Sequence, residues 1–217
     1  LPYWKSSVVK SALDLVMEGD AGDISDDAKH YLGMATTNTS RLLLLVNDFL
    51  DLQKLESGHL SFNRSVEAIN DIVKRAVDNN TMYAEQFGAR YQLDDMCENT
   101  MVDCDAHRIE QVLTNLLSNA AKYGGENDTI NVTINRSGDQ VRIQITDHGP
   151  GIPREFRPRV FEKFAMAKEG NQKKVKSSGL GLSIAKAIIE HHGGKIGFNT
   201  EIGDGTTFYF ELPVINA

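Results

Sequence analysis

The sequence predicts an α+β fold: a sandwich of one mixed β-sheet with helices on one face, preceded by a two-helix hairpin. Apolar residues recur at alternating spacings of four and three through residues 31–52, as in a helix bundle. Short stretches of alternating apolar and polar residues, typical of strands, follow in the second half of the chain. Helical patterns separate these stretches irregularly, which favours an α+β arrangement over repeated βαβ units.

The composition is that of an ordinary globular protein. At 217 residues the chain is long enough for a small element followed by a domain of about 150 residues. The net charge of −7 provides no basic surface for nucleic acid, and no apolar run approaches the ~20 residues of a membrane span. Cys97 and Cys104 lack metal or redox spacing and are expected to be reduced thiols. We therefore expect a cytoplasmic chain without nucleic-acid or membrane contacts. Because it opens at Leu1 without a methionine, we expect a fragment of a longer protein that could be membrane-anchored.

The helical hairpin is predicted over residues 1–57. Its first helix is expected over Ser6–Met17, and Ser25 is expected to cap the second helix, with Asp26 and Asp27 in the first turn. The second helix carries the seam at heptad spacing, formed by Tyr31, Ala35, Asn38, Leu42, Leu45, Phe49 and Leu52.

Three further residues, Leu43, Val46 and Leu50, widen this stripe beyond what one partner helix can cover. A hairpin this apolar is expected to form a homodimer through a four-helix bundle. The alternative is a hairpin that packs on its own domain.

The sandwich domain is predicted over residues 58–217. Helices are expected over residues 67–86, 105–123 and 181–192, the last of them ended by Gly193 and Gly194. Strands are expected near residues 100–103, 129–135, 140–146, 195–199 and 206–212.

The helix over residues 105–123 carries an unusual polar row. Gln111, Asn115, Asn119 and Lys122 are spaced by four, four and three, so they stack along one side. Asparagine is a poor helix former, so two of them one turn apart need an explanation. The row is either a solvated face or a set of ligands for a nucleotide. In the second case an asparagine oxygen can ligate Mg²⁺, and Lys122 can neutralise a phosphate.

A strand runs into the motif D-x-G-x-G, formed by Asp147, Gly149 and Gly151 and followed by Ile152. A carboxylate at the strand end can accept a hydrogen bond from the adenine amino group. Guanine offers a carbonyl there, which would leave two unpaired acceptors at about 1–3 kcal/mol each. The motif alone is equally consistent with a simple loop, and His148 within it is interpreted as a loop residue.

Gly179, Leu180, Gly181 and Leu182 open the helix over residues 181–192, where backbone N–H groups can bind phosphates. The irregular stretch 153–178 before them is long enough to be a functional lid. We expect Phe161 and Phe164 to anchor it. Four lysines, expected to face the phosphates or else to form a solvated surface, are Lys168, Lys173, Lys174 and Lys176. Thr206 follows a glycine turn into the last strand.

The order and spacing of these motifs resemble the histidine kinases, which share an ATPase superfamily with type II topoisomerases, mismatch-repair ATPases and heat-shock chaperones. The resemblance covers residues 59–213 through four boxes: N (115–123), G1 (147–153), F (161–164) and G2 (179–182). Residues 1–58 look like the family's dimerisation and histidine-phosphotransfer hairpin.

The resemblance implies a set of site residues. Asn119 becomes the Mg²⁺ ligand and Asp147 the adenine acceptor. Asn115 and Lys122, the expected catalytic residues, line the phosphate and ribose side with Tyr123. The remaining expected nucleotide contacts are Gly149, Gly151, Ile152, Phe161, Phe164, Lys176, Gly179, Leu180, Gly181, Leu182 and Thr206.

One position separates the subfamilies. Hydrolysing relatives carry a water-activating glutamate one turn before the Mg²⁺-binding asparagine, and here that position is Asn115. We therefore expect a kinase that transfers the γ-phosphoryl group of ATP to a histidine, with a response-regulator receiver domain as its partner. The alternatives are an ATPase of this superfamily and an ATP-binding dimeric scaffold.

The family's acceptor histidine, on the first hairpin helix, has no counterpart in this sequence. The six histidines are His30, His59, His107, His148, His191 and His192, and none lies in residues 1–24. Alignment of residues 9–13 with the family puts the missing histidine just before Leu1. We expect it there, the alternative being a pseudokinase-like partner that has lost it. His30 is interpreted as a solvated helix residue.

Overall fold

The computed structural model describes residues 11–13, 15, 16, 22, 24–56, 61–95, 100–125, 127–166 and 178–215. The chain divides into two compact units, Leu1–Gly58 and His59–Ala217.

The first unit contains the long helix α2, Asp26–Glu56. Ser25 caps it as predicted, because its Oγ accepts a hydrogen bond from the N–H of Ala28 at 3.2 Å. Residues 11–13, 15 and 16 are helical; the rest of the predicted first helix, within 6–17, lies outside the described residues.

Several seam side chains of α2 are exposed in the single chain. Leu42 is 62% exposed, and Tyr31, Asn38 and Phe49 are exposed as well, whereas the side chains of Leu45 and Leu52 lie outside the described residues. An exposed apolar stripe on a helix is characteristic of a surface that a partner covers. His30 is also exposed, as predicted.

The second unit is built on a five-stranded sheet with the order β2-β4-β5-β7-β6. Its strands are β2 (Arg90–Asp95), β4 (Thr129–Ser137), β5 (Gln140–Asp147), β6 (Lys195–Glu201) and β7 (Gly205–Pro213). Strands β2 and β4 pair in parallel and all other neighbours pair antiparallel, so the sheet is mixed, as predicted. A second, two-stranded sheet pairs β1 (Ser65–Ala68) with β3 (Met101–Cys104).

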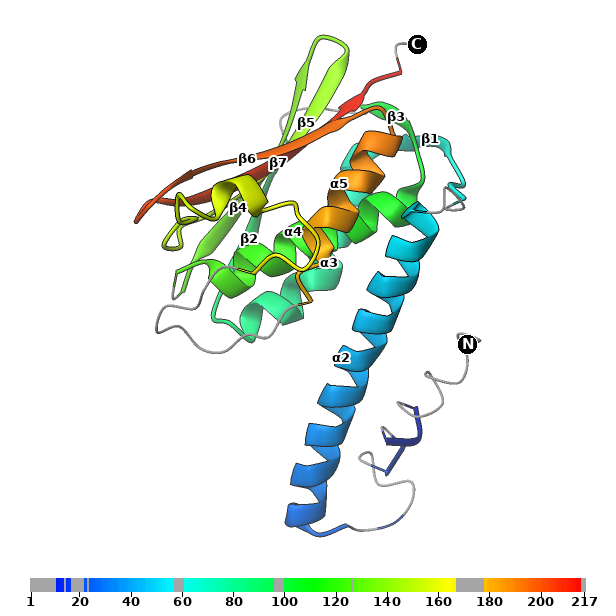
Figure 1. Ribbon diagram of the computed structural model, residues 1–217, viewed down its shortest axis with the longest axis vertical. Coiled ribbons are helices and arrows are strands. Elements are labelled where there is room, and N and C mark those ends of the chain that lie inside the picture. Colours follow the sequence, from blue (N-terminus) through cyan, green and yellow to red (C-terminus); the bar gives the residue numbers. More distant parts are fainter. Residues whose placement is uncertain are drawn as a thin grey trace. The chain divides into compact units, whose positions relative to one another are not determined.

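Three helices lie on one face of the five-stranded sheet: α3 (Ile69–Glu85), α4 (Ala106–Tyr123) and α5 (Gly181–His191) (Figure 1). The apolar faces of the helices and the alternate residues of the strands form the core between the two layers. In β5, for example, Val141, Ile143 and Ile145 are buried while the residues between them are half-buried. This arrangement confirms the predicted α+β sandwich.

The boundaries of the first predicted helix of this domain need a correction. Residues 67 and 68 belong to β1, and α3 begins only at Ile69. Val66 and Glu67 pair with Asp103 and Val102 of β3, a long-range pairing that a local helical pattern cannot reveal.

Candidate functional site

Helix α4 presents the polar row that the sequence predicts. Asp105 caps the helix by accepting the N–H of Arg108 at 3.1 Å. Five large apolar residues fix the buried face of the helix: Ile109, Val112, Leu113, Leu116 and Leu117. Asn115, Asn119 and Lys122 are only half-buried. A core-facing stripe therefore orients the amide and ammonium groups along one edge of the domain.

Asn115 joins the N box to the G2 box. Its Nδ2 donates to the carbonyl of Gly181, the first residue of α5, at 3.2 Å. A Cβ at position 181 would meet Oδ1 of Asn115 at 2.9 Å, so glycine accommodates the close contact between this amide and the start of α5. The start of α5, whose backbone N–H groups can bind an anion, is thereby held beside α4.

Asp147 is the last residue of β5. It is 4% exposed, and its Oδ1 accepts the N–H of Gly149 at 3.0 Å. Burial is the largest influence on its pKa and raises it to about 6. The N–H groups of Gly149 and Thr206 and the charge of His148 lower the pKa, whereas the negative charge of Asp128 raises it further. A carboxylate offers about four acceptor positions, so these two N–H groups leave acceptor capacity for a ligand.

The G1 loop packs tightly against the end of α4. A side chain at position 149 would overlap the carbonyl oxygen of Tyr123, the last residue of α4. The backbone contact between Gly149 and Tyr123 therefore brings Asp147 to the same end of α4 as Lys122. The structure thus assembles the N, G1 and G2 boxes around one helix.

Ile152, Gly151 and Thr206 lie close to Asp147 and contact the end of β6. The N–H of Ile152 donates to Oγ1 of Thr200 at 2.9 Å, and the hydroxyls of Thr200 and buried Thr206 lie 3.0 Å apart. Thr206 is also the strand partner of Asp147. Gly151 lies against Glu201, where a side chain would overlap its carbonyl oxygen.

The two F-box phenylalanines have different environments. The ring of Phe161 packs near those of Phe198 and Phe208, with centroids 6.0 and 6.5 Å away, and so anchors the segment as predicted. Phe164 is exposed, so the prediction that it is a second anchor is wrong. Its backbone instead lies against Gly179, beside buried Leu180 and half-buried Leu182, where the G2 box begins.

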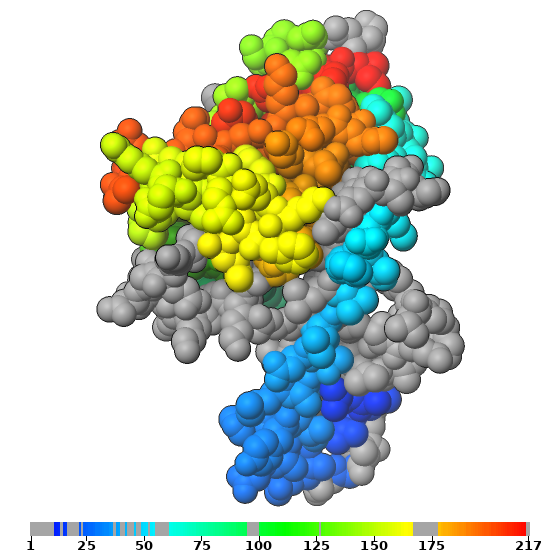
Figure 2. Space-filling view, in the orientation of Figure 1, coloured from blue at the N-terminus to red at the C-terminus, as the bar shows by residue number. Residues whose placement is uncertain are grey.

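The segment through Phe161 and Phe164, yellow in Figure 2, occupies the surface next to α5, shown in orange. Lys168, Lys173, Lys174 and Lys176 lie outside the described residues.

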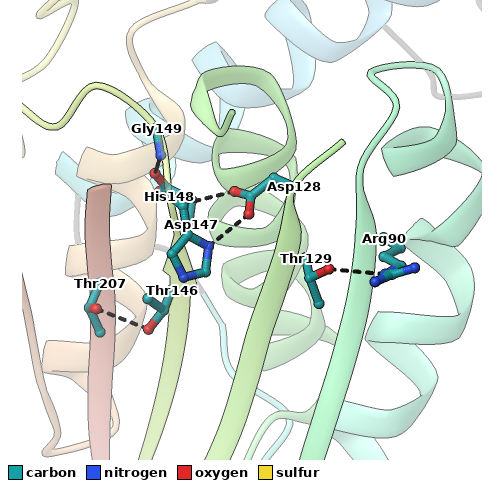
Figure 3. Close-up of polar contacts among 8 residues, drawn as sticks. All are labelled: Arg90, Asp128, Thr129, Thr146, Asp147, His148, Gly149 and Thr207. Carbon is teal, nitrogen blue, oxygen red and sulfur yellow. Dashed lines mark hydrogen bonds and ion pairs between the residues drawn. The ribbon is translucent and has the colours of Figure 1, made fainter. Parts of the chain in front are cut away.

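Sequence reasoning missed two features. Asp128, which precedes β4, is buried, and its two carboxylate oxygens bond the N–H and Nδ1 of His148 at 2.8 and 2.7 Å (Figure 3). The interpretation of His148 as a loop residue is therefore incomplete. Tyr83 on α3 lies under Lys122, whose Nζ is 5.7 Å from the ring centroid. Neither residue belongs to a recognisable motif, and both depend on long-range contacts.

The side chains of the site can also be tested for their ability to bind a metal ion. Among the described residues there is no cluster of three or more histidine, cysteine, aspartate or glutamate side chains that could hold an ion. The half-buried amide of Asn119 offers a single neutral oxygen. This donor fits Mg²⁺ accompanying a nucleotide, because that ion takes most of its ligands from phosphates and water.

No helix within the described ranges has the length and apolar character needed to cross a lipid bilayer. Cys104 is a free, buried thiol, and Cys97 lies outside the described residues. Burial raises the pKa of Cys104 to about 12, so this thiol is unreactive at neutral pH.

Comparisons with known proteins agree with this geometry. Residues 104–216 match the family described as histidine kinase-, DNA gyrase B-, and HSP90-like ATPase. The sensor histidine kinase WalK of Bacillus subtilis is 33% identical over 209 residues, covering 95% of this chain and 34% of WalK. The chain thus spans about a third of that relative.

Two solved structures share the fold. Full-length ShkA in complex with AMPPNP matches the whole chain, and 47% of ShkA, with a TM-score of 0.77 at 22% identity. The histidine kinase ThkA, in complex with the response regulator TrrA, matches 97% of this chain and 58% of ThkA, with a TM-score of 0.68 at 26% identity. The chain belongs to the histidine kinase-, DNA gyrase B- and HSP90-like ATPase family, and it is homologous to the sensor histidine kinases.

Proposed function

We propose that this chain is the catalytic core of a sensor histidine kinase, which binds Mg²⁺-ATP and transfers the γ-phosphoryl group to a histidine. The observation that carries the proposal is the convergence of three boxes on α4. Asn115 bonds the start of α5, while Tyr123 contacts the loop that follows Asp147.

In this proposal Asp147 accepts a hydrogen bond from the adenine amino group. Thr206 and the G1 residues Gly149, Gly151 and Ile152 form the surrounding wall. The buried position of Asp147 makes the contact selective, because an unpaired acceptor facing it in a dry pocket is costly.

The phosphates would lie between the end of α4 and the start of α5. Backbone N–H groups of the G2 box bind the anion, and Lys122 neutralises part of its charge. Asn119 would hold Mg²⁺, which screens the phosphate oxygens and aligns them for in-line attack. These residues act by binding and orientation, so the nucleophile must come from elsewhere.

Asn115 favours transfer over hydrolysis. Its amide cannot act as a general base, and its Nδ2 is engaged by the Gly181 carbonyl. Water bound near the γ-phosphate would therefore lack an activating carboxylate at this position. A superfamily ATPase is correspondingly disfavoured.

A second candidate function is an ATP-binding dimeric scaffold without phosphotransfer of its own. It is favoured by the absence of histidine from residues 1–24. Labelling of a chain extended upstream by a histidine-bearing helix distinguishes the two functions, because a scaffold would remain unlabelled.

We further propose two protein partners. A second copy of the chain would cover the exposed seam of α2, forming a four-helix bundle. A response-regulator receiver domain would accept the phosphoryl group, as the ThkA–TrrA complex suggests by analogy. The chain would act in the cytoplasm as part of a longer protein.

Asn119→Ala is expected to lower the affinity for ATP in the presence of Mg²⁺ by at least roughly tenfold while leaving the fold intact. Asn119 is half-buried and borders the proposed phosphate site, so its loss removes an ion ligand and leaves the core unchanged. Calorimetric titration with and without Mg²⁺ measures the effect.

The matched control is Gln111→Ala on the same polar row, two turns earlier, where Gln111 accepts a hydrogen bond from Arg108 at 2.8 Å. This variant should bind ATP like the parent chain. Unfolding of Asn119→Ala by several kcal/mol would instead assign Asn119 a structural role.

A chain that begins at residue 58 is expected to be monomeric and to bind ATP with unchanged affinity. It loses the exposed α2 seam but keeps the whole unit His59–Ala217. Light scattering of the long and short chains tests this. A dimeric short chain would move the interface to the sandwich domain.

A further inference from the structure

Asp128 and His148 make a second polar contact at the proposed adenine site. Asp128 precedes β4, and its carboxylate side chain is 4% exposed, whereas the imidazole of His148 is 53% exposed. The carboxylate accepts the His148 N–H at 2.8 Å and lies 2.7 Å from Nδ1. A buried carboxylate is thus held by a solvated imidazole from the G1 loop, in the residue that follows Asp147.

The contact joins two loops. A side chain at Gly124 would meet Oδ2 of Asp128 at 2.7 Å, and one at Gly125 would meet the His148 carbonyl oxygen at 3.3 Å. The loop after α4 is therefore packed against the G1 loop. Figure 3 shows Asp128 reaching across from β4 to His148, directly beside Asp147 at the end of β5.

The pair also places charge beside Asp147. The negative charge of Asp128 disfavours ionisation of Asp147, and His148 favours it. β7 and the G1 loop contribute neutral donors, the Thr206 N–H and the Gly149 N–H. The charged groups of neighbouring elements are Lys122, at the same end of α4 as Asp147, and Arg90 on β2, whose guanidinium donates to Thr129 at 3.0 Å.

We infer that Asp128 and His148 act as a pair that positions Asp147 and sets its electrostatic environment. The pair would thereby set the pH range over which the protein binds a nucleotide. The inference rests on the proposed function of Asp147. Because a positive charge on His148 favours the ionised form of Asp147, the pair would limit the loss of affinity at low pH.

Two substitutions test the charges in opposite directions. Asp128→Asn removes the negative neighbour and keeps an oxygen for the His148 N–H. His148→Asn keeps a neutral donor near the place of Nδ1 but removes the imidazole, whose charge favours ionisation of Asp147. The control is Thr207→Val, which removes a neutral hydrogen bond of 2.9 Å to Thr146, next to Asp147, without changing any charge.

The first measurement is the NMR titration of the Asp147 carboxyl carbon in the nucleotide-free protein. Asp128→Asn is expected to lower its midpoint by roughly half a pH unit or more, and His148→Asn to raise it; Thr207→Val should leave it unchanged. The second measurement is the affinity for ATP from pH 5 to pH 8. The pH at which the affinity falls on the acid side should be lower in Asp128→Asn and higher in His148→Asn. The nucleotide titrates equally in every sample, so its own protonation cancels when the variants are compared.

The outcomes are distinct. If both variants weaken ATP binding by a constant factor at every pH and the midpoint stays fixed, the pair is only structural and the inference is overturned. If the midpoints shift as expected but no variant and no parent chain binds ATP, the coupling stands and the proposed function fails. If Asp128→Asn does not fold, the Asp147 midpoint in His148→Asn still tests the inference. The His148 side chain is half-exposed, so its replacement should leave the fold intact.

Discussion

When the chain is incubated with Mg²⁺ and γ-labelled ATP, it is expected to bind the nucleotide but to remain unlabelled. None of its six histidines lies in residues 1–24, the part that we propose to correspond to the family's acceptor helix. His192 is buried, with its Nε2 accepting the Asp105 N–H and its Nδ1 against the Ile188 carbonyl, so it is not an available nucleophile. His30 is exposed but lies on α2.

The positive control supplies the missing acceptor. A chain extended upstream of Leu1 by a helix segment that carries a histidine should become labelled, and the label should be acid-labile and base-stable, as expected of a phospho-imidazole. A histidine-bearing partner with Asp147→Asn should be labelled in trans in mixed dimers. Strong acid-labile label on the 217-residue chain alone would instead identify one of its own histidines as the acceptor.

Asp147→Asn is expected to lower the affinity for ATP by about 10- to 100-fold, because an acceptor-only carboxylate becomes an amide that can present a donor to the adenine amino group. Calorimetric titration at pH 8 measures the loss. The charge-matched control is Asp204→Asn in the exposed turn between β6 and β7, which should bind ATP normally.

The same substitution is expected to stabilise the protein at pH 8. Burial raises the Asp147 pKa from 3.8 to about 6, so between these values the folded state binds the proton more tightly than the unfolded state. The contribution of this group to stability is therefore present at low pH and lost as the pH rises through 6. Asp147→Asn should raise the free energy of unfolding by about 1–3 kcal/mol at pH 8, with no gain below about pH 4. Denaturant titrations at the two pH values test this trade-off between stability and binding.

The sequence predicts best the elements whose patterns are local and complete. The alternation of Phe208, Phe210 and Leu212 with more polar residues identifies β7, and the Asp105 cap with a strong apolar face identifies α4. Each element buries its own apolar face, so periodicity alone is sufficient. Strands β1 and β2 were missed because they are short or lie at an edge of a sheet, and their pairing with β3 and β4 depends on residues distant in the sequence.

The candidate site follows the same rule. Motif spacing brings out Asn119, Asp147 and the glycines, because a glycine required by close backbone approach leaves a fixed position in the sequence. Asp128 and Tyr83 leave no such signal. Their relation to His148 and Lys122 arises only when the loop after α4 and helix α3 pack beside the site.

The most direct test of the account is a calorimetric comparison of ATP and GTP binding to the unmodified chain with Mg²⁺ at pH 8. We expect micromolar binding of ATP and at least roughly tenfold weaker binding of GTP, because the guanine carbonyl would face the Asp147 carboxylate. Equal affinities for the two nucleotides, or no binding of either, would contradict it.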